Sequence, residues 1–183
     1  MMRRINSIIT GAMMLTFLIH AISGAFMMLN IMEGGSMLLI VATNLFVILA
    51  FIHILIGAKL TADSLRTIKK SGVYYFRENL VFWARRVSGF AIILFMVFHV
   101  LIFAGRSEDG FFRLNLFGSF ELVISLVFVV CLAIHIISNI NPLLISLGIP
   151  SLRKYSGDIL FVLSVVMLFC AAGFIGYYIL WIR

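Results

Sequence analysis

The stretch FGSFELVISLVFVVCLAIHIISNI, from Phe117 to Ile140, decides the fold of this chain. Apart from Glu121 near its start, it is almost wholly apolar over about the 20 residues that a helix needs to cross a bilayer. His135 lies inside it. The first prediction is therefore a membrane-spanning helix with an ionisable side chain at depth, which is rare because it is costly there.

Four further stretches share this character: Ile5 to Leu29, Met37 to Leu60, Ala84 to Ala104 and Ile159 to Trp181. Of the 183 residues, 63% are hydrophobic and only 11% charged. The longest connection, Thr61 to Trp83, is too short for a soluble domain with its own core. We expect one all-α integral membrane domain over residues 1–183, made of a four-helix bundle and a fifth transmembrane helix, with no soluble nucleotide-binding or catalytic domain.

The positive charges are distributed unequally between the two ends of the predicted spans. Eleven arginines and lysines fall on one side and three on the other. We expect the chain in the cell inner membrane. Since cytoplasmic loops hold an excess of these residues, its amino terminus is expected on the cytoplasmic side and its carboxyl terminus on the outer side. This bias accounts for most of the net charge of +7, so no nucleic-acid partner is needed to explain it.

Four histidines, one in each of the first four spans, carry the functional prediction. At about 1.5 Å per residue, His20 and His99 lie about 20 Å from the cytoplasmic ends of their helices, and His53 and His135 about 10 Å from theirs. Diagonal helices of an up-down four-helix bundle run in the same direction. The sequence therefore predicts an outer pair, His20 with His99, and an inner pair, His53 with His135.

Two imidazoles that face each other across a bundle core can bind a haem iron axially. We therefore expect two bis-histidine b haems, because the chain has no C-x-x-C-H motif for covalent attachment. A structural zinc site would need four ligands at one depth, and each pair supplies two. A proton relay and plain hydrogen bonding between helices are the remaining alternatives.

Residues near the histidines indicate how haem would be accommodated. Gly24 and Gly57 each follow a histidine by four residues and would leave room for a flat macrocycle, with close helix packing as the alternative. Arg106, near the outer end, is expected at the outer haem's propionates or as an interfacial arginine. The residues expected at the inner haem's propionates are Arg86, Ser88, Ser138 and Asn139.

Five helices, the four histidines and Arg86-x-Ser88-Gly89 before the third histidine resemble the single-subunit dihaem cytochrome b of succinate:quinone oxidoreductases, the group of bacterial fumarate reductases and succinate dehydrogenases. The resemblance covers nearly the whole chain. It implies a membrane anchor that passes electrons between menaquinone or another quinone and a cytoplasmic head, made of a flavoprotein subunit and an iron–sulfur subunit. Such an anchor is the quinone-reactive part of the enzyme and does not act on succinate or fumarate alone.

The resemblance also assigns places to the cofactors and partners. It implies that the inner pair, His53 and His135, holds the haem nearer the iron–sulfur subunit and that the outer pair holds the distal haem. The basic connection Thr61 to Trp83 would dock the iron–sulfur subunit, with binding to lipid headgroups as the alternative.

A quinone site near the distal haem, which the family has, needs a group that exchanges protons with the quinone. Glu33 is the sole acid in the short connection between the first two spans and is our first choice for this catalytic role. Glu121, Glu108 and Asp109 lie at the same end. Plain solvated loop carboxylates are the alternative for all four.

Other function classes make different predictions. A dihaem cytochrome b of a hydrogenase or formate dehydrogenase would also have about five spans, but some of these proteins place two ligand histidines on one helix, and here no helix has two. A transporter would have paired acidic residues in discontinuous helices at the midplane, and the predicted spans have none. A haem-free scaffold would show no visible absorption.

Overall fold

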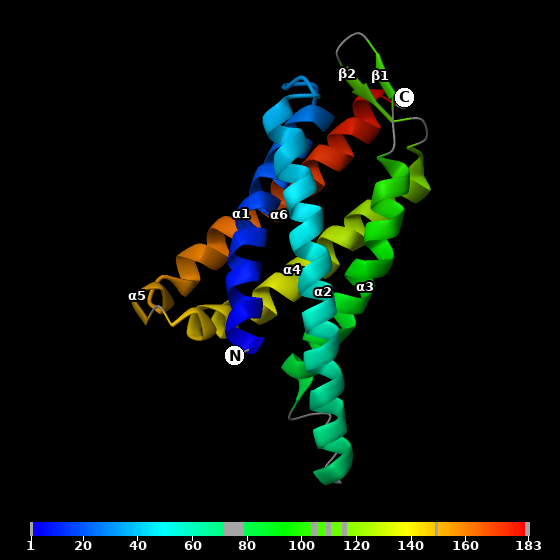
Figure 1. The fold of residues 1–183 in the computed structure, drawn as a ribbon. Coiled ribbons are helices and arrows are strands. Elements are labelled where there is room, and N and C mark those ends of the chain that lie inside the picture. The colour runs from blue at the N-terminus through cyan, green and yellow to red at the C-terminus, as the bar shows by residue number, and fades with distance from the viewer. Residues whose placement is uncertain are drawn as a thin grey trace.

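The computed structural model describes residues 2–71, 79–103, 106–108, 111–114, 117–148 and 150–181. Helices dominate these ranges, and a short hairpin of two antiparallel strands, β1 and β2, lies between the third and fourth helix (Figure 1). In chain order the elements are α1 (Met2–Met28), α2 (Met37–Ser71), α3 (Leu80–Ile102), β1 (Arg106–Glu108), β2 (Phe111–Arg113), α4 (Ser119–Leu147), α5 (Pro150–Arg153) and α6 (Ser156–Trp181).

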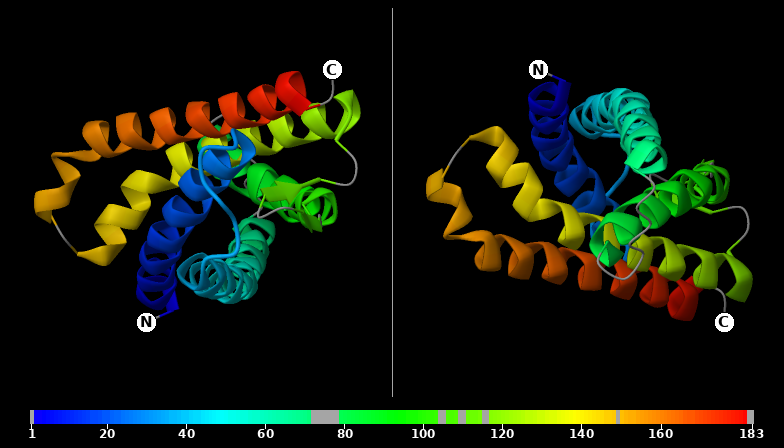
Figure 2. Two further views of the ribbon diagram at one scale, coloured as in Figure 1. Left: turned by 90° about the horizontal axis from the view of Figure 1, so that it is seen from above. Right: turned by 90° about the horizontal axis from the view of Figure 1, so that it is seen from below.

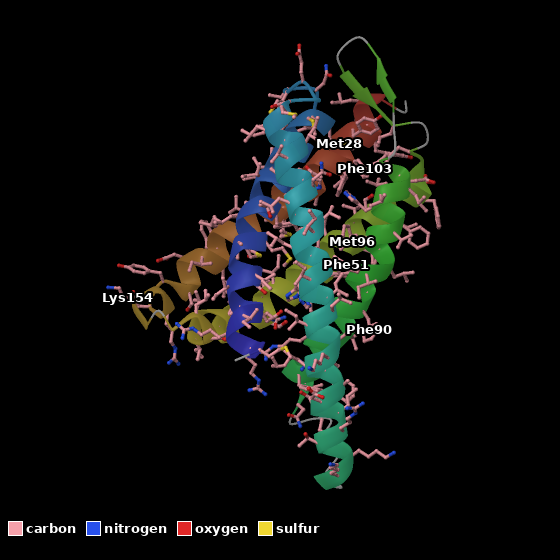
Figure 3. All side chains as sticks on the ribbon, in the orientation of Figure 1. Met28, Phe51, Phe90, Met96, Phe103 and Lys154 are labelled. Carbon is pink, nitrogen blue, oxygen red and sulfur yellow. The ribbon has the colours of Figure 1, made fainter. Side chains whose placement is uncertain are left out.

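Five helices of the described ranges, α1, α2, α3, α4 and α6, are long and apolar enough to cross a membrane. Large apolar side chains are exposed along them, as surfaces that face lipid require: Phe51 on α2 is 62% exposed and Phe90 on α3 is 71% exposed (Figure 3). The chain is therefore a multi-pass membrane protein, which confirms the predicted transmembrane helical class. Haem binding by the bundle remains a prediction.

The helices pack as two hairpins with α6 beside them. Helix α1 packs against α2 and α3 against α4, while α6 packs against both α1 and α4, on the side away from α2 (Figure 2). Small residues allow α1 and α6 to approach closely, since a Cβ atom on Gly173 would lie only 3.3 Å from Ala25 Cα. The largest buried cluster joins α1, α4 and α6 through side chains that include Phe17, Val129 and Phe174.

Helix α2 is longer than the sequence predicted. It continues to Ser71 rather than ending near Leu60, and Figure 1 shows its last turns extending beyond the other helices. Residues 61–71 contain no glycine or proline and several good helix formers, so the helix outlasts the apolar segment. The predicted connection Thr61 to Trp83 is therefore helical at both ends, because α3 begins at Leu80, and residues 72–78 lie outside the described part of the chain.

Helix α4 also passes its expected end. The sequence predicts an end at Ile140, before Asn141 and Pro142, because proline usually stops a helix. Instead, α4 continues through Pro142 to Leu147 and ends at Gly148, whose φ of 73° is left-handed, a conformation that glycine adopts without strain. The start of α1 and the end of α6 lie at opposite ends of the molecule, as five spans require (Figure 1). Which end is cytoplasmic remains a prediction.

Candidate functional site

The structure brings the four histidines together in two pairs. In each pair, one histidine comes from the α1–α2 hairpin and the other from the α3–α4 hairpin. The ring centroids of His20 on α1 and His99 on α3 are 6.1 Å apart, with an interplanar angle of 75°. Those of His53 on α2 and His135 on α4 are 6.4 Å apart, with an angle of 83°. These are the outer and inner pairs that helix direction and depth predicted.

His53 is oriented by α1, its neighbour within the hairpin. Its Nδ1 lies 3.1 Å from Thr10 Oγ1 and 3.2 Å from Asn6 Oδ1. Thr10 donates its own proton to the Asn6 carbonyl oxygen at 2.8 Å, so its hydroxyl oxygen accepts from the ring. Two acceptors around Nδ1 place the ring proton there and leave Nε2 with a free lone pair, the form of histidine that binds a metal.

His135 is oriented in the same way by α3. Its Nδ1 donates to the Arg85 carbonyl oxygen at 3.2 Å and lies 3.2 Å from Ser88 Oγ. Ser88 is buried and gives its proton to the Ala84 carbonyl oxygen at 2.6 Å, so it too is an acceptor for the ring. Gly89 allows the ring this close, because a Cβ atom there would lie 3.2 Å from His135 Cε1. Both inner rings thus present Nε2 unprotonated.

The outer pair has different surroundings. His20 Nδ1 lies 3.2 Å from Thr43 Oγ1 on α2, and its ring stacks on Phe46 at a centroid distance of 5.7 Å. His99 Nδ1 is buried without a hydrogen-bond partner. The His99 ring instead contacts Phe103 and Phe128, with centroids 4.5 Å and 5.5 Å away. The outer pair therefore has one oriented ring and one ring held by aromatic packing alone.

The spacing within each pair fits a metal ion between the two rings. A nitrogen–metal bond is about 2 Å long, and a ring nitrogen lies roughly 1 Å from its ring centre, so two ligands on opposite sides of one ion have centroids about 6 Å apart. The observed 6.1 Å and 6.4 Å agree with this. Among the described residues, no third histidine, cysteine or carboxylate joins either pair. Two protein ligands are the number that a haem iron takes when the macrocycle supplies the other four.

Gly24 and Gly57 have open space around them. A Cβ atom at either position would meet nothing within 4 Å. The two glycines therefore differ from Gly89 and Gly173, whose missing side chains let another helix come close. Open space beside two histidine-bearing helices is compatible with a bound macrocycle, and that role stays a prediction.

The predicted propionate ligands fall into two groups. Ser138 and Asn139 donate to the His135 carbonyl oxygen, at 3.1 Å and 2.7 Å, so they are bonded within their own helix, as Ser88 is within α3. Arg86 is different: its guanidinium lies 4.0 Å from the centre of the Phe82 ring, and its Nε is buried without a partner. Arg86 thus retains a donor for an anionic group.

The acidic residues expected near the quinone are only partly placed. Glu33 is exposed in the turn between α1 and α2, where Asn30 and Gly35 have positive φ values of 59° and 85°. The carboxylate of Glu121 accepts from the Gly118 N–H at 2.7 Å and caps the start of α4. The proton-exchanging role of Glu33 stays a prediction. The side chains of Arg106 and Glu108 in β1, and the whole of Asp109, lie outside the described residues.

Sequence reasoning missed the residues that orient the rings, namely Asn6, Thr10, Thr43 and Arg85. A signal for two of them was present. Thr10 precedes His20 by ten residues on α1, and Thr43 precedes His53 by ten residues on α2. Because the two helices are antiparallel, this equal spacing places each threonine beside the histidine of the other helix, which the structure shows.

Comparisons of the chain with protein-family models, with curated proteins and with solved structures find no match. Within its described residues, the chain is a membrane protein with five apolar helices and two facing histidine pairs inside them.

Proposed function

We propose that this chain is a dihaem cytochrome b, with one haem between His20 and His99 and another between His53 and His135. The observation that carries the proposal is the centroid separation of 6.1 Å and 6.4 Å in two separate pairs of histidines at membrane depth. Ionisable side chains inside a membrane are costly and usually mark a functional site, and two matching pairs are difficult to explain by packing alone.

The haems would supply reversible one-electron chemistry, and the chain supplies their ligands and surroundings. Hydrogen bonds at Nδ1 hold the rings of His53, His135 and His20, and the acceptors at His53 and His135 leave their Nε2 atoms free to bind a haem iron. Thr10, level with the inner pair, lies ten residues before His20 on the same helix. The two pairs are therefore about 15 Å apart along α1, which gives a stepwise route across the bilayer.

The same proposal includes the partners of the chain. The resemblance to succinate:quinone oxidoreductases supports a flavoprotein and iron–sulfur head on the cytoplasmic side and a quinone near the outer pair. The protruding end of α2 (Figure 1) supports a docking surface there, since its last turn carries Lys69 and Lys70. A basic helix end attracts an acidic protein surface.

Deletion of the chain from its native membranes tests this assignment. We expect succinate or fumarate activity with artificial dyes to leave the membrane fraction and the quinone-coupled reaction to disappear, with both restored by the wild-type chain. If quinone-coupled succinate activity were unchanged, the assignment would be wrong. Loss of hydrogen- or formate-dependent quinone reduction would instead assign the chain to the cytochromes b of those enzymes.

A further inference from the structure

Pro142 lies inside α4 and interrupts the backbone hydrogen bonding of this helix. Proline has no N–H group, so the carbonyl oxygen four residues earlier, that of Ser138, has no helical hydrogen-bond donor. Helices in a membrane must satisfy such groups internally or through a neighbouring helix, because lipid cannot. Ser138 lies three residues after His135, so the break falls one turn from an inner ligand.

The missing donor comes from another helix. Arg85 on α3 donates from Nε to the Ser138 carbonyl oxygen at 2.8 Å. This is a charge-assisted bond, which is stronger than one between neutral groups. Helix α4 thus continues past Pro142 because Arg85 on α3 donates to the carbonyl oxygen that a residue with an N–H group would otherwise bond.

The backbone of the same arginine holds the His135 ring, because the Arg85 carbonyl oxygen accepts from His135 Nδ1 at 3.2 Å. Arg85 therefore contacts α4 at two places one turn apart, through its backbone at His135 and through its side chain at Ser138. We call these two hydrogen bonds the Arg85 bridge. The neighbouring Arg86 makes no such bond at Nε.

We propose that Arg85 is a positioning residue for His135: the Arg85 bridge fixes the rotation of α4 against α3 and so sets the direction in which the inner ligand presents Nε2. This inference rests on the proposed haem function. It assigns the two adjacent arginines different roles: Arg85 holds α4 against α3, and Arg86 remains available for a ligand.

Pro142 makes a rescue experiment possible. In Arg85→Leu the Ser138 carbonyl oxygen loses its donor, and we expect the inner haem to be retained roughly tenfold less well or to show an altered low-spin spectrum. Pro142→Ala restores a backbone N–H at position 142 and should be silent by itself. In the double variant Arg85→Leu/Pro142→Ala, the restored N–H bonds to Ser138, so the inner haem should return toward its wild-type content and spectrum.

The readouts are haem content and the low-spin electron paramagnetic resonance signal of each haem, with the outer haem as the internal control. A double variant as defective as Arg85→Leu alone, or an Arg85→Leu protein with an unchanged inner haem, would overturn the inference and leave the proposed function intact. A wild-type chain without haem would overturn both. If Arg85→Leu does not fold, recovery of folded, haem-loaded protein in the double variant supports the bridge, and failure to recover it contradicts the bridge.

Discussion

The inner and outer histidine pairs have almost the same separation but different surroundings. Both inner rings, His53 and His135, have acceptors at Nδ1, and Arg85 and Arg86 lie on the adjoining turn of α3. In the outer pair, His20 has one hydroxyl partner and His99 has none, and phenylalanines contact both rings. The inner pair is thus oriented by hydrogen bonds and the outer pair largely by aromatic packing.

Under the proposed haem function, this difference predicts that ligand geometry and ligand electronics are set separately in this fold. The pairing itself depends on helix direction and depth, which are alike for both pairs. A hydrogen bond at Nδ1 makes an imidazole a more basic ligand, and nearby cations favour the reduced iron. Two sites of equal geometry are therefore expected to differ in redox potential and in their response to substitution.

The largest expected effect follows from removal of a ligand. His53→Ala or His135→Ala should remove the inner haem and leave the outer one, whereas His20→Ala or His99→Ala should do the opposite. Each variant should lose about half of the b-type absorbance in a reduced-minus-oxidised spectrum, because an iron with one axial ligand is held weakly. A single variant that still showed two low-spin haems would exclude that histidine as a ligand.

The second largest effect is expected on quinone turnover, at the end of the molecule near the outer pair. Glu33→Gln should leave both haems and the dye-coupled activity of the head unchanged but abolish quinone turnover, because the amide cannot exchange protons with the quinone. Glu121→Gln is the matched control, since its carboxylate already caps α4. Normal quinone turnover in Glu33→Gln together with its loss in Glu121→Gln would reverse the assignment.

A smaller effect is expected from the charge beside the inner pair. Arg86→Leu should lower the midpoint potential of the inner haem, on the order of 50 mV, because a cation stabilises the added electron. Arg86→Lys keeps the charge and should retain most of the potential. A potentiometric titration that showed equal shifts of both haems would contradict the separation of the two sites.

The smallest expected effect is on the redox potentials, and it distinguishes Thr43 beside His20 from Thr10 beside His53. Thr43→Val removes the hydrogen-bond partner of His20 Nδ1 and should shift the outer potential by about 20 to 40 mV, because the basicity of the ligand changes. Thr10→Val should shift the inner potential less, since Asn6 Oδ1 remains 3.2 Å from His53 Nδ1. A larger shift in Thr10→Val than in Thr43→Val would show that the Asn6 bond does not compensate.

The sequence predicted the parts of the fold that hydrophobicity and helical spacing determine. Five spans and the pairing of the histidines follow from apolar length, direction and depth, and the structure shows both. The end of α2 could not be read from hydropathy, because an apolar segment marks where lipid ends and not where backbone hydrogen bonding ends. Residues 61–71 are mostly polar and are nevertheless helical.

The partners of the histidines were harder to predict because they come from other helices. By local rules Pro142 predicts the end of α4, because these rules consider only the N–H that proline lacks. Arg85, more than fifty residues earlier in the chain, supplies the replacement donor, and no local pattern reveals it. The threonines could have been found from their equal spacing before the histidines, once an antiparallel hairpin was assumed.

The haem content of the purified chain tests the central claim most directly. The protein is produced in the membranes of a host with an ample haem supply and purified in detergent, and non-covalent haem b is measured against protein by the pyridine haemochrome method. We predict two haems b per chain. A ratio of one would show that only one of the two pairs binds a haem, and a chain without haem would contradict the account.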